Sequence, residues 1–264
     1  MKLTTDKMLA AVEDGIGWMT FNNPERRNAV SEDMRPAMGQ ILTAFQNDPA
    51  VRVVVMTGAG DKAFVSGVDI TQYDKRRQGS AVTASSAPAV APLSQAFVAL
   101  EKPLIAMIRG YCLGGGMDIA LRADLRIAAD DAKFGIPTAR LGNVYRGDMI
   151  AQVINLLGPS RTAEIIFTAD HFSAEDALRM GLVNRVVTGD GLEQSVRSIA
   201  KKIAENAPLT IRATKVIIRE LLKPHGEQDV SYMKEVERIC LDSADFAEGR
   251  LAFKEKRKPV FVGR

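Results

Sequence analysis

The chain is organised around one glycine-rich stretch, Gly110-Tyr111-Cys112-Leu113-Gly114-Gly115-Gly116-Met117-Asp118. The apolar run before it, residues 103–108, predicts a buried strand, and the residues after it continue as a helix. Three consecutive glycines at a strand-to-helix junction leave backbone N–H groups uncovered by side chains, and the first N–H groups of a helix lack intrahelical partners. Such a turn can hold a phosphate, a carboxylate or an oxyanion that forms during a reaction. A tight connection that needs a positive φ explains the glycines equally well.

Motifs and composition exclude several classes of function. The glycine run is neither G-x-x-x-x-G-K-[ST] nor G-x-G-x-x-G, so neither common nucleotide-binding motif is present here. A net charge of +3 over 264 residues is too small to indicate nucleic acid, and no apolar run approaches the length of a membrane-spanning helix. Cys112 and Cys240 form no metal-binding spacing, and nothing indicates an oxidising compartment. We therefore expect a cytoplasmic protein without a bound metal.

The N-terminal half of the sequence has the pattern of an α/β fold. Residues 8–12 and 16–21 predict a β-hairpin, and a helix that begins at Ser31 with one apolar face precedes a buried strand at 51–56. A second glycine-containing connection, residues 62–70, follows that strand. Strand, loop and helix thus occur twice with a glycine where the strand ends, which indicates stacked, related units.

Helices predominate in the C-terminal part of the chain. Ser173 and Asp176 have the spacing of a capping box, which predicts the start of a helix. From residue 192 to 253 the pattern is helix after helix. We therefore expect an α/β core over residues 1–190 and a C-terminal all-α region over residues 191–264.

Several short motifs follow one another along nearly the whole chain. They are Asn23-Pro24-x-x-x-Asn28-Ala29, Lys62-Ala63-Phe64-x-x-Gly67-x-Asp69-Ile70, Gly110-Tyr111-x-Leu113-Gly114-Gly115-Gly116, Phe134-Gly-x-Pro137, Leu141-Gly142, Ser173-Ala174-x-Asp176-Ala177-x-x-x-Gly181-Leu182-Val183 and Glu255-Lys256-Arg257. In this order and spacing they resemble the crotonase superfamily, the enoyl-CoA hydratase/isomerase family. The resemblance implies a crotonase-like spiral of repeated ββα units. It also implies a C-terminal all-α oligomerisation region that packs subunits into a homotrimer or a dimer of trimers.

The resemblance also implies a function and a site. Members of the family process acyl-CoA thioesters and stabilise an enolate in an oxyanion hole made by two backbone N–H groups. Carried over by position, these donors are the N–H groups of Val68 and Gly115. One such donor typically contributes about 2.7–4 kcal/mol to a transition state. We expect an enoyl-CoA hydratase or isomerase that needs no cofactor, since coenzyme A is part of the substrate.

The sequence departs from the family at the acid–base positions. A hydratase of the family carries glutamates where this chain has Asp118 and Thr138, one to activate water and one to deliver a proton to carbon. Aspartate can act as a base with a shorter reach, whereas a threonine hydroxyl is no proton shuttle near neutral pH. Dienoyl-CoA isomerases of the family use an aspartate at the position that corresponds to Asp118 of this chain. Their other two acidic positions correspond to Thr138 and Arg146. The alternatives are a hydrolase, C–C lyase or dehalogenase that uses Asp118 or Asp148 on a CoA thioester, or a non-catalytic acyl-CoA-binding homologue.

Further residues are candidates for the chemistry or for substrate contact. Tyr145, Arg146 and Asp148 lie in a polar segment at the expected mouth of the pocket, where they can supply acid–base or anion-binding groups. The alternative is the N-terminus of a helix with Asp148 as its cap. Asp118 likewise has an alternative role: in the first turn of a helix, its negative charge can simply interact favourably with the helix dipole. The remaining candidates for contact with the substrate or its CoA are Arg27, Lys62, Ser66, Asp69, Ile70, Gly114, Thr138 and Lys256.

Overall fold

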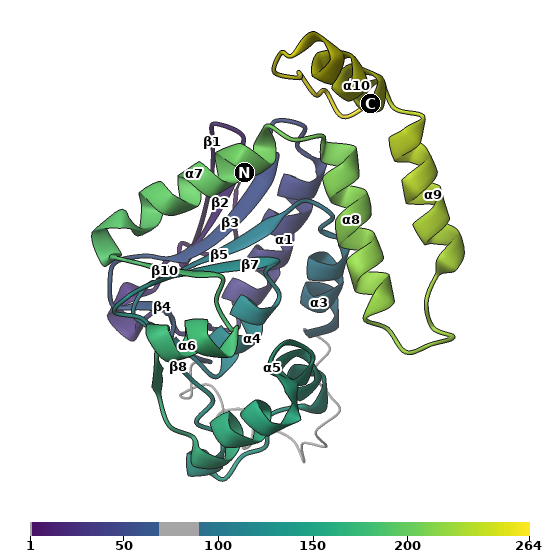
Figure 1. The fold of residues 1–264 in the computed structure, drawn as a ribbon. Coiled ribbons are helices and arrows are strands. Elements are labelled where there is room, and N and C mark those ends of the chain that lie inside the picture. The colour runs from purple at the N-terminus through teal and green to yellow at the C-terminus, as the bar shows by residue number, and fades with distance from the viewer. Residues whose placement is uncertain (1, 69–89) are drawn as a thin grey trace.

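The computed structural model describes residues 2–68 and 90–264, and within them two sheets are flanked by helices (Figure 1). The larger sheet has six strands within this described part, in the order β1 (Met8–Glu13), β2 (Ile16–Phe21), β3 (Val53–Gly58), β5 (Leu104–Ile108), β7 (Leu125–Ala129) and β10 (Arg185–Val187). β1 and β2 pair antiparallel, and the other neighbours pair parallel. The predicted hairpin and the strand before the glycine run are confirmed.

The smaller sheet repeats the strand order of the larger one. Its strands are β4 (Ala63–Val65), β6 (Tyr111–Leu113), β8 (Lys133–Gly135) and β9 (Phe172–Ser173). β3, β5 and β7 of the larger sheet are each followed along the chain by a short strand, β4, β6 or β8, of the smaller sheet. After β6 the chain enters α4 (Gly115–Leu121) directly. The pair of strands therefore recurs along the chain as layers of one spiral.

The larger sheet is covered by helices on both faces, as expected for parallel strands that are mostly apolar and buried. Successive side chains of a strand point to opposite faces. Val53 and Val55 pack under α7 (Leu192–Ala204), whereas Val54 and Met56 belong to the core on the side of α1 (Met34–Asn47). Every residue of the apolar face predicted for α1 is buried: Met34, Ala37, Met38, Ile41, Leu42 and Phe45.

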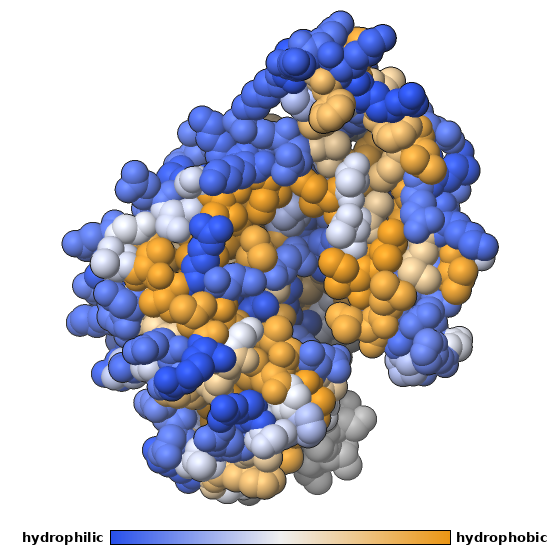
Figure 2. Space-filling model, viewed as in Figure 1, coloured by the Kyte–Doolittle hydropathy of each residue, from blue (hydrophilic) through white to orange (hydrophobic). Residues whose placement is uncertain are grey.

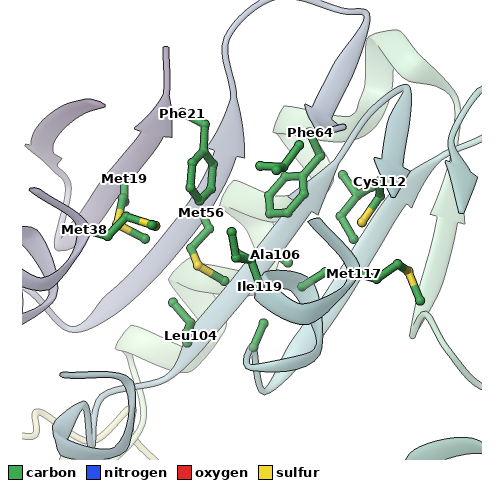
Figure 3. Packing of buried hydrophobic residues seen from close by; sticks show 14 of the residues in the cluster. Met19, Phe21, Met38, Met56, Phe64, Leu104, Ala106, Cys112, Met117 and Ile119 are labelled. Atoms are coloured by element: carbon green, nitrogen blue, oxygen red, sulfur yellow. The ribbon is translucent and has the colours of Figure 1, made fainter. Parts of the chain in front are cut away.

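The core on the α1 side extends into the smaller sheet. Figure 3 shows Phe21 and Phe64 facing each other from the two sheets, with ring centroids 5.5 Å apart and an interplanar angle of 73°. Cys112 of the glycine run lies in the same buried cluster. Cys112 is fully buried there and is an apolar core residue, and its burial raises the pKa of the thiol.

One predicted helix boundary is wrong. The sequence predicts Ser31 as the start of α1, but the helix begins at Met34 and Asp33 takes the cap position. The Ser31 hydroxyl donates to the Asp33 carboxylate, which also accepts from the hydroxyl of Thr5 at 2.6 Å. Ser31 therefore binds a side chain instead of a backbone N–H group of the first turn.

The second half of the chain is largely helical, as predicted. α5 (Gly147–Thr168) is broken at Gly158, whose φ of 76° and ψ of 168° are not helical. α6 (Ala174–Met180) begins with the predicted capping box, in which Ser173 and Asp176 each accept from the other's backbone N–H. No helix within the described ranges has the length and apolar character needed to cross a bilayer.

The last helices extend away from the core in Figure 1. α8 (Pro208–Leu221) follows α7 and packs against α9 (Val230–Leu241), and α10 (Ala244–Glu255) ends the helical region. Figure 2 shows apolar residues gathered over α8 on this face of the molecule. Large apolar side chains on these three helices stay exposed, among them Ile218, Leu221, Leu241, Leu251 and Phe253.

Candidate active site

The glycine run places the start of α4 between the two sheets. β6 ends at Leu113 and α4 begins at Gly115. Gly114, between them, has a φ of 50° and a ψ of −108°, a conformation that residues with side chains rarely adopt. Its N–H donates to the carbonyl oxygen of Gly135 on β8 at 2.9 Å. The explanation by positive φ therefore applies to Gly114.

Gly116 has a different reason to be glycine. A Cβ atom there would lie 2.0 Å from the carbonyl oxygen of Val65, so the first turn of α4 packs directly on β4. The same contact brings Gly115 beside the segment that follows β4. A Cβ atom on Gly115 would lie 3.0 Å from Cγ2 and 3.5 Å from the backbone nitrogen of Val68. Within the described residues, neither the Val68 N–H nor the Gly115 N–H donates a hydrogen bond.

The loop that precedes α1 holds the Val68 segment in place. The buried Asn28 amide donates to the carbonyl oxygens of Ala59 and Ala63, at 3.0 and 2.7 Å. The Val30 N–H donates to the carbonyl oxygen of Gly67 at 2.9 Å. Asn28 of the Asn-Pro…Asn-Ala motif thus fixes the start of β4, and Val30 just after the motif fixes the segment that follows β4.

A pocket with a volume of about 50 Å³ opens beside Val68 and Gly115. Its apolar lining comes from the loop before α1, from α1, α3 (Val90–Ala99), α4 and α5, and comprises Val30, Met38, Leu93, Phe97, Ile119 and Met149. Among the described residues, the lining of the pocket also includes three charged side chains, those of Arg35, Asp118 and Arg122. A mainly apolar pocket with a few polar groups is typical of a site for a small molecule.

Asp118 faces this pocket and is paired with Arg122, one helical turn later. Nη2 of Arg122 lies 3.3 Å from Oδ1 of Asp118, and the two side chains are only 14% and 13% exposed. Nε2 of Gln152 on α5 donates to the same oxygen at 3.4 Å. Asp118 is therefore more than a solvated first-turn acid, and in the described lining it is the single carboxylate.

Arg122 and Gln152 were not predicted from the sequence. An acid four residues before an arginine on one helix indicates an ion pair, and this spacing was the available signal for Arg122. No local signal connects Gln152 with Asp118, because they lie on different helices.

Thr138 and Tyr145 are buried polar groups near the glycine run. The Thr138 hydroxyl is buried and has no hydrogen-bond partner among the described residues. The Tyr145 hydroxyl donates to the carbonyl oxygen of Gly114 at 3.2 Å. Burial raises the pKa of Tyr145, and the nearby charge of Asp118 acts in the same direction. In this arrangement Tyr145 supports the Gly114 turn and stays protonated near neutral pH.

Arg146 and Asp148 form an ion pair at the start of α5. Arg146 is the residue before the helix, and Asp148 stands in its first turn. The hydrogen bond from Arg146 holds the pKa of Asp148 below its usual value. About half of each side chain is exposed, and neither residue belongs to the described lining of the pocket. The helix N-terminus that the sequence left open as an alternative is present, but the expected cap is wrong, because Arg146 and not Asp148 takes the cap position.

Three candidates for CoA contact lie beside the loop that carries Val68. The exposed guanidinium of Arg27 lies 5.1 Å from the ring centroid of Tyr111 on β6. Ser66 joins the Val68 segment to the loop before α1, since the Ser66 N–H donates to the carbonyl oxygen of Arg27 at 3.1 Å. Lys62 is exposed just before β4. These residues form an open polar surface next to the Val68 segment.

Other candidates lie elsewhere. Lys256 follows α10, which Figure 1 places far from α4, and it is not among the described lining residues of the pocket. Asp69 and Ile70 lie outside the described residues. Among the residues that are described, no three His, Cys, Asp or Glu side chains gather in a group able to hold a metal ion.

Sequence comparison relates the whole chain to one family. Residues 11–264 match the profile described as enoyl-CoA hydratase/isomerase. The crotonyl-CoA hydratase of Syntrophomonas wolfei is 33% identical over 260 residues, which cover 98% of this chain and 99% of the relative. The carnitinyl-CoA dehydratase of Escherichia coli K12 is 37% identical over 251 residues, which cover 93% of this chain and 94% of the relative.

Solved structures share the fold over the same extent. An enoyl-CoA hydratase/carnithine racemase from Magnetospirillum magneticum superimposes with a TM-score of 0.91 at 33% identity, covering 99% of this chain and 97% of that one. An enoyl-CoA hydratase from Bacillus anthracis gives a TM-score of 0.86 at 30% identity, covering 98% and 100%. The predicted α/β spiral with a helical C-terminal region is confirmed.

Proposed function

The chain belongs to the enoyl-CoA hydratase/isomerase family, and from that premise we propose that it binds the thioester carbonyl of an acyl-CoA between the N–H groups of Val68 and Gly115. Membership makes the chain an acyl-CoA-processing enzyme of the hydratase/isomerase type. The proposed reaction passes through a thioester enolate. It either adds water to the double bond of an enoyl-CoA, forms that double bond by removing water, or moves it along the acyl chain.

One observation carries the proposed oxyanion hole. A Cβ atom on Gly115 would lie 3.5 Å from the backbone nitrogen of Val68, so the two chain segments converge beside the pocket. Neither N–H has an acceptor among the described residues. Negative charge that develops on a thioester oxygen at this place would meet two donors that need no rearrangement. Removal of one such donor typically costs about 2.7–4 kcal/mol in the transition state.

Asp118 supplies the acid–base group of the proposed reaction. In an isomerisation it removes a proton from one carbon of the acyl chain and returns it to another, so one carboxylate is sufficient. In a hydration it accepts a proton from water while the water oxygen bonds to the β-carbon. The same proton then passes from Asp118 to the α-carbon, so the proton balance closes without a second carboxylate. The Thr138 hydroxyl is buried and Thr138 is not among the described lining residues, so it takes no part in this proton transfer.

The similar proteins support water addition or removal as the leading form of the reaction. One relative is named a crotonyl-CoA hydratase and another a carnitinyl-CoA dehydratase.

The surroundings of the site extend the proposal to CoA binding and assembly. Arg27, Lys62 and Ser66 lie beside the Val68 segment and would contact the CoA moiety. Lys256 follows α10, far from α4 of its own chain, so it would reach a CoA only from another copy. We therefore expect a cytoplasmic homo-oligomer, either a trimer or a dimer of trimers, that needs no additional cofactor.

A panel of short acyl-CoAs and enoyl-CoAs, incubated in ¹⁸O-labelled water and followed by mass spectrometry, tests the reaction. Hydration places ¹⁸O in the acyl group, whereas isomerisation leaves the oxygen content unchanged. Hydrolysis releases free CoA, and dehalogenation or C–C cleavage changes the acyl mass. If acyl-CoAs bind but none of them turns over, the enzymatic proposal is wrong and the chain is a binding protein.

A further inference from the structure

The acyl pocket contains a guanidinium group that the proposed chemistry does not use. Arg122 stands at the C-terminal end of α4 and lines the pocket together with Phe97, whose ring centroid lies 5.3 Å from its guanidinium carbon. The side chain is only 14% exposed. An arginine on a mainly apolar wall loses much of its hydration, which is costly unless its donors find acceptors.

Most donors of Arg122 have no acceptor in the described part of the chain. Its hydrogen bonds to Asp118 both come from Nη2, at 3.3 and 3.5 Å, and are long for a charge-assisted pair. Nε and Nη1 donate to no described residue. A guanidinium presents five N–H donors in a rigid fork that matches a carboxylate in two places. Among the described residues, nothing occupies the Nε and Nη1 side of this fork, and a ligand in the pocket can bind there.

We propose that the acyl group of the substrate carries a second carboxylate, which binds to Arg122. This inference rests on the proposed function, since it names the class of acyl-CoA that the same site takes. Asp118, the one carboxylate of the described lining, meets only Nη2 of Arg122, so this guanidinium favours an anionic acyl group over a cationic one. A plain alkyl group in this pocket would leave the Arg122 donors unmet.

The geometry limits the length of this acyl group. Asp118 lies three residues after Gly115, a rise of about 4.5 Å along the helix. Nη2 of Arg122 lies 3.3 Å from Asp118 Oδ1, so its fork points back towards the start of α4. A carboxylate on Arg122 would thus lie roughly 5–8 Å from a carbonyl held at Gly115, which corresponds to a dicarboxylic monothioester of about four to six carbons.

A matched pair of thioesters tests the inference. Glutaryl-CoA and pentanoyl-CoA have the same number of acyl carbons and differ in the terminal carboxylate, so their dissociation constants are measured by titration calorimetry. We expect the wild-type protein to bind glutaryl-CoA about 10- to 100-fold more tightly, the range of a charge-assisted pair of hydrogen bonds. Equal affinities for the pair, or tighter binding of pentanoyl-CoA, would overturn the inference and leave the proposed function standing. Failure of both to bind would contradict acyl-CoA recognition itself.

Substitutions assign the preference to Arg122. Arg122→Met keeps a long apolar side chain beside Phe97 but removes the fork, and it should reduce the preference to about threefold or less. Arg122→Lys keeps the charge and should retain an intermediate preference, which also covers the case in which Arg122→Met does not fold. Arg161→Met removes an exposed arginine that pairs with Glu164 on α5 and serves as the control. A preference that survives both changes at Arg122 would show that another residue binds the carboxylate.

Discussion

The carbonyl oxygen of Val65 fills the space that a side chain on Gly116 would need. A Cβ atom at Gly116 would lie 2.0 Å from that oxygen, closer than any real contact of this kind. The contact joins the last residue of β4 to the first turn of α4. It therefore sets the separation between Val68 and Gly115, the two proposed oxyanion donors, although neither takes part in it.

We predict that Gly116→Ala lowers the free energy of unfolding by about 1–3 kcal/mol, because the backbone of β4 or α4 must shift to admit one methyl group. Turnover should fall as well, since the shift moves the Gly115 N–H. Urea unfolding and kcat/KM on an active enoyl-CoA measure the two effects. Gly39→Ala in α1 is the control, because a Cβ atom there meets nothing within 4 Å and should stabilise the helix by about 0.5–1 kcal/mol. Unchanged stability in Gly116→Ala would mean that β4 and α4 have room for a methyl group, which would contradict the prediction.

Asp118→Asn should lower kcat by about 10²- to 10⁴-fold while the protein stays folded, because the amide keeps the shape of the side chain but cannot accept a proton. Steady-state measurement of kcat and of the melting temperature on the same preparation separates the catalytic effect from a structural one. Asp242→Asn makes the same chemical change in an exposed pair with Arg238 on α9 and should leave kcat unaltered. A fully active Asp118→Asn enzyme would remove Asp118 from the mechanism.

Much of the fold could be predicted because its signals are local. The apolar periodicity of α1, the alternation of the hairpin and the Ser173–Asp176 capping box each depend on neighbours within a few residues, and all three are present in the structure. By contrast, the predicted start of α1 was wrong, because Thr5 and Ser31 both bind the Asp33 side chain. A contact from 28 residues away cannot be found in a local pattern.

The site could be predicted only in part. The glycine run and Asp118 stood out in the sequence, and the structure brings both to one pocket. The reason for Gly116 could not be predicted, because Val65 lies on a strand from an earlier layer of the spiral. Burial of Arg122 was hidden for a similar reason, since Phe97 comes from another helix. Such packing between layers leaves no spacing rule in the sequence.

Tyr145→Phe tests whether this tyrosine takes part in proton transfer. Its hydroxyl donates to the Gly114 carbonyl, so we expect a loss of about 0.5–1.5 kcal/mol in the free energy of unfolding and less than about a tenfold change in kcat. Chemical denaturation and steady-state kinetics at neutral pH are the measurements. A loss of more than about a hundredfold in kcat, with stability unaltered, would instead return Tyr145 to the list of acid–base groups.

Lys215 predicts a dependence of stability on pH. Its Nζ on α8 donates to the carbonyl oxygen of Lys102 and to Oδ2 of Asp124, each at 2.7 Å. Burial lowers the pKa of Lys215 to about 8, whereas an unfolded lysine titrates near 10.4. Between these values the unfolded chain holds more protons, so this group makes the folded protein more stable as the pH rises.

The difference in unfolding free energy between wild type and Lys215→Met isolates this effect. From pH 7.5 to 9.5 the wild type should gain about 2 kcal/mol relative to the variant. Lys234→Met changes a lysine on α9 whose side chain is not part of this network and should show no such trend. A difference that stays constant over this pH range would mean that Lys215 keeps its proton throughout.

The exposed apolar side chains of the last helices predict that copies of the chain associate. Phe253 on α10 is 88% exposed, and Leu251 and Leu241 are also exposed nearby on α10 and α9. Apolar surface of this kind gains stability when it is removed from water, and a second copy of the chain is the partner we expect. Sedimentation equilibrium at micromolar concentration should therefore give the mass of a trimer or a hexamer. Phe253→Asp should shift the distribution to smaller species because it would bury a charge in the contact, whereas Lys254→Asp on the same helix should not. A wild-type protein that sediments as a monomer would contradict the prediction, and it would also leave Lys256 without a route to any CoA.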